Sequence, residues 1–201
     1  MTGRAVLAEK TQWRTALVSA RRALPAGERA ARAAALAAAA VQLAATTGGP
    51  VCAYLPVGSE PGSPELVAAL HDAGHEVLLP VVPAETGPLD WAAYTGPGSL
   101  AAAPLGLREP TGPRLGPDAI SRARLVLVPG LAADRRGMRL GRGAGHYDRT
   151  LPLAAPDVPI VIVLNDDELV ERLPAEPHDR PVTGALLAGA GLVTLGNNRR
   201  P

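Results

Sequence analysis

Residues 125–149 read LVLVPGLAADRRGMRLGRGAGHYDR, and this stretch decides the fold. It opens with a continuous apolar run, Leu125–Val128, which is typical of a strand buried on both faces of a sheet. Comparable runs occur at 51–55 and 160–164, and segments with helical spacing separate them. Buried strands that alternate with helices predict an α/β protein with a mostly parallel sheet and helices on both faces.

The rest of the chain extends this pattern in both directions. Periodicity and breakers predict helices over 8–24, 27–45, 63–74, 117–123 and 166–173, with a short helix after the glycine-rich turn at 137–145. Further strands are expected at 75–82, 89–94 and 191–195, and 83–117 is otherwise rich in loops. Ser63-Pro64-Glu65 is a typical helix start, with a capping hydroxyl and an early proline. We therefore expect one three-layer α/β domain over residues 1–201, with a disordered tail after about residue 196.

Composition bounds the class of protein. A chain of 201 residues is long enough to bury a core without disulfides or a structural metal. The single cysteine, Cys52, excludes an internal disulfide, and no Cys/His spacing resembles a zinc site. No apolar run reaches the length of a membrane span, and residues 1–9 lack the order of a signal peptide. These features predict a cytoplasmic protein with no membrane partner.

Charge is unevenly distributed, although the net charge is only +1. Residues 1–32 carry seven basic and two acidic side chains, residues 134–149 carry five and two, and residues 51–90 carry six acids with no Lys or Arg. Two separated basic segments favour a small phosphate-bearing ligand. A nucleic-acid partner is not expected, because such proteins usually combine a basic excess with stacking aromatics, and this chain has no Phe. For the first segment, a solvated basic helix face is an equally open interpretation.

The turn at 137–145 carries the strongest chemical signal. Gly141, Gly143 and Gly145 stand at alternate positions, and glycine lets successive backbone amides point toward one anion because it has no Cβ and tolerates positive φ. A following helix adds its N-terminal amides, and Arg139 and Arg142 add charge. The spacing is neither that of the Walker loop nor that of dinucleotide-binding proteins. A tight turn without a ligand is the alternative, but arginines at the end of a strand favour phosphate binding.

The run Gly-x-Arg-Leu-Gly-x-Gly-x-Gly-x-Tyr-Asp at 137–148, with Val-Pro-Gly-Leu-x-x-Asp at 128–134 before it, resembles the signature of one enzyme family. That family is the 5-formyltetrahydrofolate cyclo-ligases, or 5,10-methenyltetrahydrofolate synthetases. Other landmarks follow in the same order along the chain: Lys10 with Arg14, 54–60, Leu79-Pro80, 106–110 and 177–179. The resemblance therefore covers most of the chain, from residue 10 to residue 179.

The resemblance implies a reaction. Members of the family cyclise 5-formyltetrahydrofolate to 5,10-methenyltetrahydrofolate and hydrolyse ATP with Mg²⁺. The formyl oxygen attacks the γ-phosphate, N10 closes the ring on the activated carbon, and phosphate leaves. Such phosphoryl transfer depends mainly on positioning and on neutralised charge, which suits the arginines and the glycine-rich turn.

The resemblance also assigns roles to residues by position. Arg142 and Tyr147 are the expected catalytic residues. The residues expected to bind ATP are Lys10, Arg14, Arg139, Leu140, Gly141, Arg142, Gly143, Ala144, Gly145, His146 and Tyr147. Those expected to bind the folate are Leu55, Glu60 and His146, and those expected to bind Mg²⁺ are Asp148 and Asp179.

Each of these residues has a plainer alternative on sequence alone. Lys10 and Arg14 suit an exposed helix face, and Glu60 suits a solvated loop. Asp148 suits a helix cap, and Asp179 suits a turn. Two further residues are predicted to have no catalytic role, since Asp134 is expected to bind loop amides and Cys52 to be a small buried hydrophobe.

Four positions depart from the family pattern. Ala144 stands where lysine is frequent, His146 replaces one of a pair of tyrosines, and Ala133 replaces an aromatic residue. The counterpart of an aromatic residue that some relatives place over the folate, near Leu105, is aliphatic. We still expect an active, monomeric ligase whose partners are reduced folate and ATP. The alternatives are an ATP-dependent ligase for another formyl or carboxyl substrate, a non-catalytic folate- or nucleotide-binding protein, and a protein whose basic first helix binds RNA or an acidic partner.

Overall fold

The computed structural model describes residues 3–176 and 179–196. Its helices are α1 (Gly3–Ala23), α2 (Ala26–Thr47), α3 (Pro64–Asp72) and α4 (His146–Thr150). Short 3-10 helices are η1 (Pro97–Ser99), η2 (Pro104–Gly106), η3 (Pro117–Arg122), η4 (Leu151–Leu153) and η5 (Asp166–Glu168). The predicted disordered tail concerns residues 197–201, which lie outside the described residues.

A seven-stranded sheet forms the centre of the molecule, with the order β12-β11-β9-β6-β1-β2-β3. Its strands are β1 (Val51–Cys52), β2 (Val77–Val81), β3 (Asp90–Tyr94), β6 (Leu125–Val128), β9 (Ile160–Leu164), β11 (Gly184–Leu187) and β12 (Gly191–Thr194). Its five inner strands, β11, β9, β6, β1 and β2, pair in parallel. The edge strands β3 and β12 pair antiparallel with β2 and β11. The predicted mostly parallel sheet is therefore confirmed.

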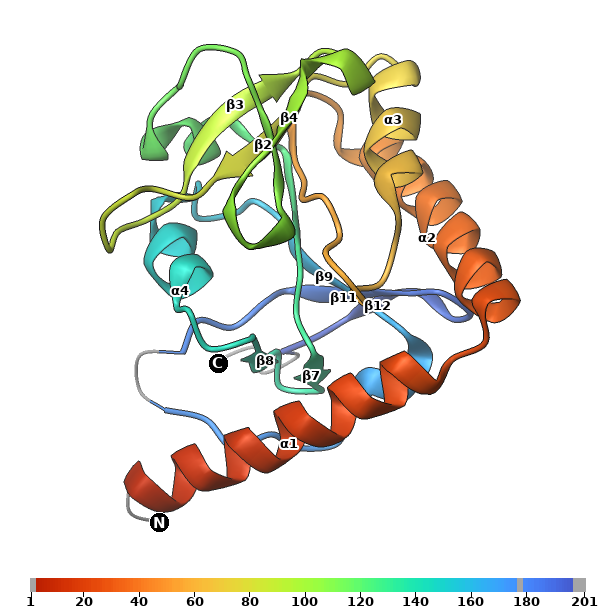
Figure 1. Ribbon diagram of the computed structural model, residues 1–201, viewed down its shortest axis with the longest axis vertical. Coiled ribbons are helices and arrows are strands. Elements are labelled where there is room, and N and C mark those ends of the chain that lie inside the picture. Colours follow the sequence, from red (N-terminus) through yellow and green to blue (C-terminus); the bar gives the residue numbers. More distant parts are fainter. Residues whose placement is uncertain (1–2, 177–178, 197–201) are drawn as a thin grey trace.

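Helices cover both faces of this sheet, as expected for three layers. On one face α2 and α3 lie side by side, and Leu36, Ala40 and Leu66 are buried against the strands (Figure 1). On the other face the cover is shorter, from η3, η4 and α4, with Ile120 and Leu151 in the core. Helix α2 has the length and apolar composition of a membrane span, which the sequence analysis did not expect, but its buried residues pack on the sheet.

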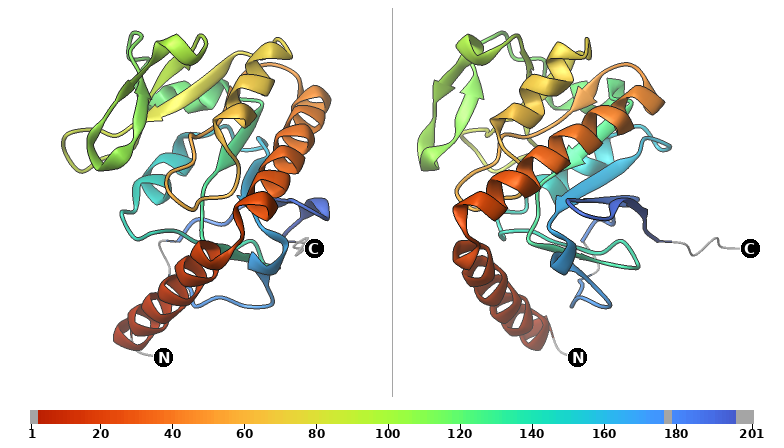
Figure 2. Two further views of the ribbon diagram at one scale, coloured as in Figure 1. Left: turned by 45° about the vertical axis from the view of Figure 1, so that its right-hand side comes forward. Right: turned by 90° about the vertical axis from the view of Figure 1, so that its right-hand side faces the viewer.

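A smaller sheet, β10-β7-β8, joins α1 to the main body. Its strands are β7 (Ala132–Asp134), β8 (Arg139–Leu140) and β10 (Leu169–Val170). Leu17 of α1 packs there with Leu131 and Leu140, and the views in Figures 1 and 2 place α1 at the end of the molecule beside these strands. This packing holds the basic first helix next to the glycine-rich turn.

Several sequence expectations are wrong in detail. The helix predicted over 166–173 is only η5 followed by β10, because Leu169 and Val170 pair with Ala133 and Asp134 instead of continuing a helix. The helix predicted at 117–123 is the 3-10 helix η3. The strand predicted at 51–55 pairs only at β1. The Ser63 side chain makes no cap hydrogen bond, although α3 does begin at Pro64.

Several strands were not anticipated, among them β11 and two strands of the loop-rich middle. Strand β11 is buried between β9 and β12, but its sequence GALL contains few residues with strong β preference. The loop-rich middle contains an antiparallel pair, β4 (Leu100–Ala102) and β5 (Arg108–Pro110). These strands have only three residues each, too few to show a period of two.

Candidate functional site

A cavity of about 890 Å³ opens at the carboxyl ends of the parallel strands. Tyr54 and Leu55 enter it after β1, Val82 after β2, and Pro129 and Gly130 after β6. In the sheet β1 lies between β2, the next strand of this sheet along the chain, and β6, so the strand order reverses at β1. Open α/β sheets bind ligands at such a reversal of strand order. The fold therefore brings together residues from separate parts of the chain at the expected edge.

The glycine-rich turn forms one wall of this cavity. Arg139, Gly141, Gly143 and Gly145 line it, together with Ala144, Leu140, Arg142, His146, Tyr147 and Asp148. Gly143 has φ +105° and Gly145 has φ +71°, conformations that an L-residue with a Cβ rarely adopts. The glycines at 141–145 follow β8 of the small sheet, not the buried strand β6 directly. The short helix predicted after the turn is α4, which has five residues.

Lys10 and Arg14 project from α1 into the same cavity. The Nζ of Lys10 is 2.9 Å from Oε2 of Glu176 and 2.7 Å from Oδ2 of Asp179. Burial alone lowers the pKa of this amine, but the two carboxylates raise it above its ordinary value. The Nε of Arg14 donates to the Gly141 carbonyl at 2.9 Å. The exposed-face alternative is therefore wrong for Lys10, whose side chain is only 5% exposed.

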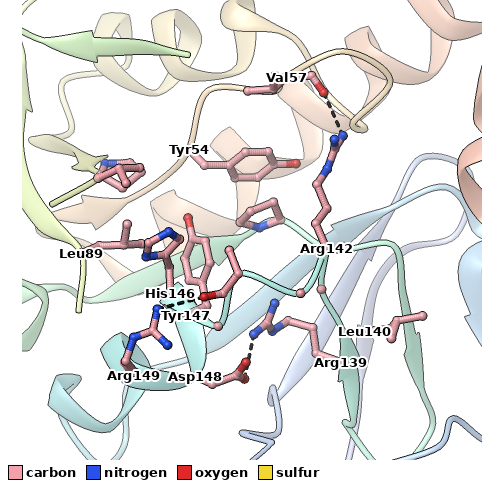
Figure 3. Close-up of a pocket in the computed structure, with 18 of the residues that line it drawn as sticks. Tyr54, Val57, Leu89, Arg139, Leu140, Arg142, His146, Tyr147, Asp148 and Arg149 are labelled. Atoms are coloured by element: carbon pink, nitrogen blue, oxygen red, sulfur yellow. Dashed lines mark hydrogen bonds and ion pairs between the residues drawn. The ribbon is translucent and has the colours of Figure 1, made fainter. Parts of the chain in front are cut away.

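Asp148 is held by the turn itself. Its Oδ1 accepts a hydrogen bond from Arg139 at 2.9 Å (Figure 3). The guanidinium of Arg139 also lies 5.6 Å from the ring centre of Tyr147, within the range of a cation–π contact. No side chain caps α4, so the capping alternative for Asp148 is wrong.

Asp179 has the turn role considered for it and also lines the cavity. Its Oδ2 accepts from the backbone amide of Glu176 at 2.7 Å, and its own amide donates to the Glu176 carbonyl at 3.1 Å. The same oxygen accepts from Lys10. Asp179 is thus a turn residue whose carboxylate also faces the cavity.

Glu60 lies in the cavity and does not belong to a solvated loop, since its side chain is 10% exposed. Its Oε1 is 2.9 Å from Nε of Arg142, and its Oε2 accepts from the Val57 amide at 2.9 Å. Arg142 also donates to the Val57 carbonyl at 3.1 Å, as Figure 3 shows. Arg142 therefore bridges the glycine-rich turn and the loop after β1, with half of its side chain exposed.

Two polar atoms of α4 lie buried without a hydrogen-bond partner in the described part of the chain. They are the hydroxyl of Tyr147 and Nδ1 of His146, and both residues line the cavity. Burial raises the pKa of the Tyr147 hydroxyl, with a smaller contribution from Glu60. A buried unsatisfied donor is costly, so these atoms are suited to contact a ligand.

A divalent cation fits the donor set that the cavity offers. Asp148 and Asp179 both line it, and Mg²⁺ is usually bound by one or two carboxylates together with substrate phosphates. Within residues 3–176 and 179–196, no group of three or more His, Cys, Asp and Glu side chains could hold a metal alone. The residues thus fit a metal that arrives with a phosphate ligand.

The structure adds residues that the sequence analysis did not place in the site. Glu176, Arg149 and Arg180 line the cavity, and only their position in the fold reveals it. Arg108 and Glu109 also line it, and the family landmark at 106–110 was a signal for them. Among the departures, Ala144 and His146 line the cavity, whereas Ala133 is fully buried in the core.

Two residues outside the cavity match their sequence interpretation. Asp134 is buried and accepts hydrogen bonds from the amides of Arg136, Met138 and Leu173. Cys52 is fully buried within the central sheet. Both residues have structural roles.

A mostly parallel α/β sheet with a cavity at its carboxyl edge is typical of the α/β proteins that bind a ligand at this edge. The particular family follows from comparison with known proteins. The family model described as "5-formyltetrahydrofolate cyclo-ligase family" matches residues 6–188, and the chain belongs to this family.

Relatives and solved structures agree with this assignment. A 5-formyltetrahydrofolate cyclo-ligase from Mycolicibacterium smegmatis is 48% identical over 190 residues, which cover 92% of this chain and 97% of the relative. One from Escherichia coli K12 is 34% identical over 134 residues, covering 66% and 74%. The structure of Aquifex aeolicus 5,10-methenyltetrahydrofolate synthetase is similar with a TM-score of 0.75 at 25% identity, covering 96% and 95%. A Mycoplasma pneumoniae synthetase, at 18% identity and a TM-score of 0.69 over 90% of this chain and 98% of that chain, shares the fold.

Proposed function

We propose that this protein cyclises 5-formyltetrahydrofolate to 5,10-methenyltetrahydrofolate at the cavity described above, with ATP as co-substrate and Mg²⁺ as the metal. One observation carries the proposal: the same cavity brings together the glycine-rich turn, the cationic side chains predicted to bind ATP (Lys10, Arg14, Arg139, Arg142) and the carboxylates predicted to bind Mg²⁺ (Asp148, Asp179). Its volume of about 890 Å³ is within the usual range for ligand pockets.

The triphosphate would lie along the glycine-rich turn. Gly143 and Gly145 have positive φ, so the backbone amides at 141–145 can turn toward one anion. Lys10 and Arg14 line the cavity from α1, and Arg14 lies against the turn, where its Nε donates to the Gly141 carbonyl; both cations would contact the phosphates. Arg139 and Asp148 are already paired in the turn, so the turn supplies both a cation for phosphate and a carboxylate for metal.

The folate would contact the apolar part of the lining, to which Leu55, Leu79 and Leu107 belong. Glu60 supplies a carboxylate that can accept hydrogen bonds from the donor edge of a pterin ring. Glu60 is paired with Arg142 of the turn. We infer from this pairing that Arg142 contacts both the formyl oxygen and the γ-phosphate.

The reaction then follows in two steps. The formyl oxygen attacks the γ-phosphorus and the bond to ADP breaks, with Arg142 and the turn amides stabilising the charge that develops on the phosphoryl oxygens. N10 next attacks the activated carbon, loses its proton and displaces phosphate. The Tyr147 hydroxyl stays protonated because burial raises its pKa, so it can donate a hydrogen bond to an oxygen of the substrate or phosphate. His146 offers a second polar contact at the same wall.

Asp148 and Asp179 would hold Mg²⁺. The chemistry that the metal supplies when bound is neutralisation and orientation of the phosphates. Each carboxylate has a cation beside it, Arg139 for Asp148 and Lys10 for Asp179. Both carboxylates line the cavity with these cations beside them before the ligand arrives.

We further propose a cytoplasmic, monomeric enzyme with no nucleic-acid or membrane partner. The near-neutral net charge and the absence of Phe argue against a nucleic-acid surface. Sedimentation of the purified protein and its retention on RNA and on anionic vesicles test these points directly.

The decisive assay follows the near-ultraviolet absorbance of methenyltetrahydrofolate. Purified protein is mixed with 5-formyltetrahydrofolate, ATP and Mg²⁺, with controls that each omit one component. An absorbance rise that needs all three supports the proposal. A flat trace from folded protein contradicts it, and thermal shifts with ATP and folate separately would then reveal a binding-only protein.

A further inference from the structure

Three residues of α1 line the cavity from one side of the helix. They are Leu7, Lys10 and Arg14, and their spacing of i, i+3 and i+7 places them on one face. The proposed phosphate contacts account for Lys10 and Arg14. Leu7 is apolar, so neither the phosphates nor the metal accounts for its place on this face.

Leu7 is exposed although it is apolar. It is 52% exposed, and the other large apolar residues that are exposed in the described part of the chain are Leu115 at 39% and Leu192 at 49%. Leu7 lines the cavity, whereas Leu115 and Leu192 lie outside it. A single exposed leucine on an outer surface needs no explanation. One in the lining of a cavity offers apolar area that a bound ligand can cover.

The order of the three residues along α1 gives a direction to the nucleotide. The Nε of Arg14 donates to the Gly141 carbonyl at 2.9 Å, so this end of the face lies against the glycine-rich turn. Leu7 precedes Arg14 by seven residues, which is about 10 Å along a helix axis. It lies toward the N-terminal end of α1, which projects from the main body (Figure 1).

The reaction fixes which end of the nucleotide lies at the turn. The γ-phosphate has to meet the formyl oxygen, and both are inferred to contact Arg142 of the turn. The nucleoside would therefore extend the other way, past Lys10 and toward Leu7. Cations near the turn and a leucine further out match the sequence of phosphates and nucleoside in ATP.

A nucleoside base suits an apolar contact of this kind. Its polar atoms lie on the edges of the ring, and its two faces can pack against a hydrocarbon side chain without leaving a polar group unpaired. Such packing removes apolar area of Leu7 from water, which stabilises the complex.

We propose that Leu7 packs against the base of ATP and is the residue of α1 by which the site distinguishes a nucleotide from bare triphosphate. This inference rests on the proposed function, because it assumes that the phosphates lie between α1 and the turn. Leu7 acts on binding and not on the chemical step, since the base takes no part in phosphoryl transfer.

The test is titration calorimetry of the full chain with MgATP, and with inorganic triphosphate and Mg²⁺ as a competitor of MgATP. Leu7→Ala removes the apolar contact and keeps a good helix former. We expect it to weaken MgATP binding about three- to ten-fold, the effect of losing about half the burial of a leucine. The affinity for triphosphate should stay the same. Leu7→Met keeps an apolar side chain of similar volume and should bind MgATP as the wild type does.

Two controls separate this contact from a general effect and from folate binding. Leu192→Ala makes the same change at a residue of similar exposure outside the cavity, and it should leave both affinities unchanged. The affinity of Leu7→Ala for 5-formyltetrahydrofolate should equal that of the wild type. Urea unfolding of Leu7→Ala should also match the wild type, because the residue is already half exposed.

The outcomes are distinct. If folded wild-type protein does not bind MgATP, the proposed function is overturned and this inference with it. If the wild type binds MgATP but Leu7→Ala binds it equally well, or loses triphosphate by the same factor, only the role of Leu7 is overturned. A loss confined to the folate, or one that Leu192→Ala reproduces, also overturns that role. Triphosphate that never displaces MgATP overturns it as well, because the base then contributes more than one apolar contact can.

Discussion

The Nε of Arg21 lies 2.6 Å from Oε1 of Glu168, and the two side chains are 1% and 3% exposed. A second nitrogen of Arg21 donates to Oε2 of Glu168 at 2.8 Å and to the Gly130 carbonyl at 2.7 Å. Asn165 donates two hydrogen bonds to the same carboxylate, one from its backbone N–H and one from its side-chain Nδ2. The pair therefore ties α1 to the turn after β9 and to the turn after β6, and so sets where Lys10 and Arg14 lie.

Glu168→Gln should destabilise the protein by about 3–5 kcal/mol, because it leaves the buried Arg21 charge without its counter-ion. The free energy of unfolding in urea measures this. Glu28→Gln breaks an exposed ion pair with Arg32 on α2, and we expect a loss below about 0.5 kcal/mol from it. Equal losses from the two variants would show that burial of the Arg21 pair contributes nothing.

Asp148→Asn should lower turnover by about 100-fold or more and raise the Mg²⁺ concentration needed for half-maximal rate, because an amide is a poor ligand for a hard cation. The amide oxygen still accepts from Arg139 but carries no charge to balance that mostly buried guanidinium, so the melting temperature should fall as well. Asp157→Asn, an exposed acid outside the cavity, is the matched control. Normal magnesium dependence in Asp148→Asn would refute the metal assignment.

Tyr147→Phe tests the unpaired hydroxyl in the cavity wall. Loss of a hydrogen bond made only to the reacting ligand should lower kcat by about 10- to 100-fold, while stability stays the same or rises because the buried hydroxyl has no partner in the described structure. Tyr94→Phe, in the core and outside the cavity, should leave kcat unchanged. An unchanged kcat in Tyr147→Phe would remove Tyr147 from the catalytic residues.

Gly143→Ala should raise the KM for ATP by about ten-fold or more. At φ +105° an alanine costs about 1–3 kcal/mol of backbone strain, and the turn would relax away from the phosphates. Gly98→Ala is the control, since its Cβ would meet nothing within 4 Å and its φ is ordinary. If the two variants have the same KM, the shape of the turn does not matter for nucleotide binding.

Cys52 should resist thiol reagents in the folded protein. Burial raises the pKa of its thiol, and the thiolate is the reactive form. At about pH 8, near the ordinary thiol pKa, we expect labelling to be at least ~100-fold slower in buffer than in denaturing urea. Labelling at equal rates would show that the central sheet opens freely around β1.

The sequence by itself determined the main architecture and the chemical signature of the site. Continuous apolar runs such as Leu125–Val128 can be satisfied only inside a covered parallel sheet, and β6 and β9 lie where the runs predicted them. The glycine-rich turn was equally evident, because glycines at alternate positions leave a local mark that needs no tertiary contact. The apolar runs and the alternate glycines are patterns among residues close together in the chain, so they can be recognised without the fold.

Only the tertiary structure decided how separate segments combine. Arg21 and Glu168 are 147 positions apart, and Lys10 and Glu176 are 166 apart, so no local pattern pairs them. The segment 166–173 has a helix-like sequence, but burial of Glu168 against Arg21 and pairing of β10 with β7 turn it into a strand. Whether a charge is buried or paired depends on the side chain that the fold places opposite it. Long-range packing decides that side chain, and the periodicity of the sequence does not encode it.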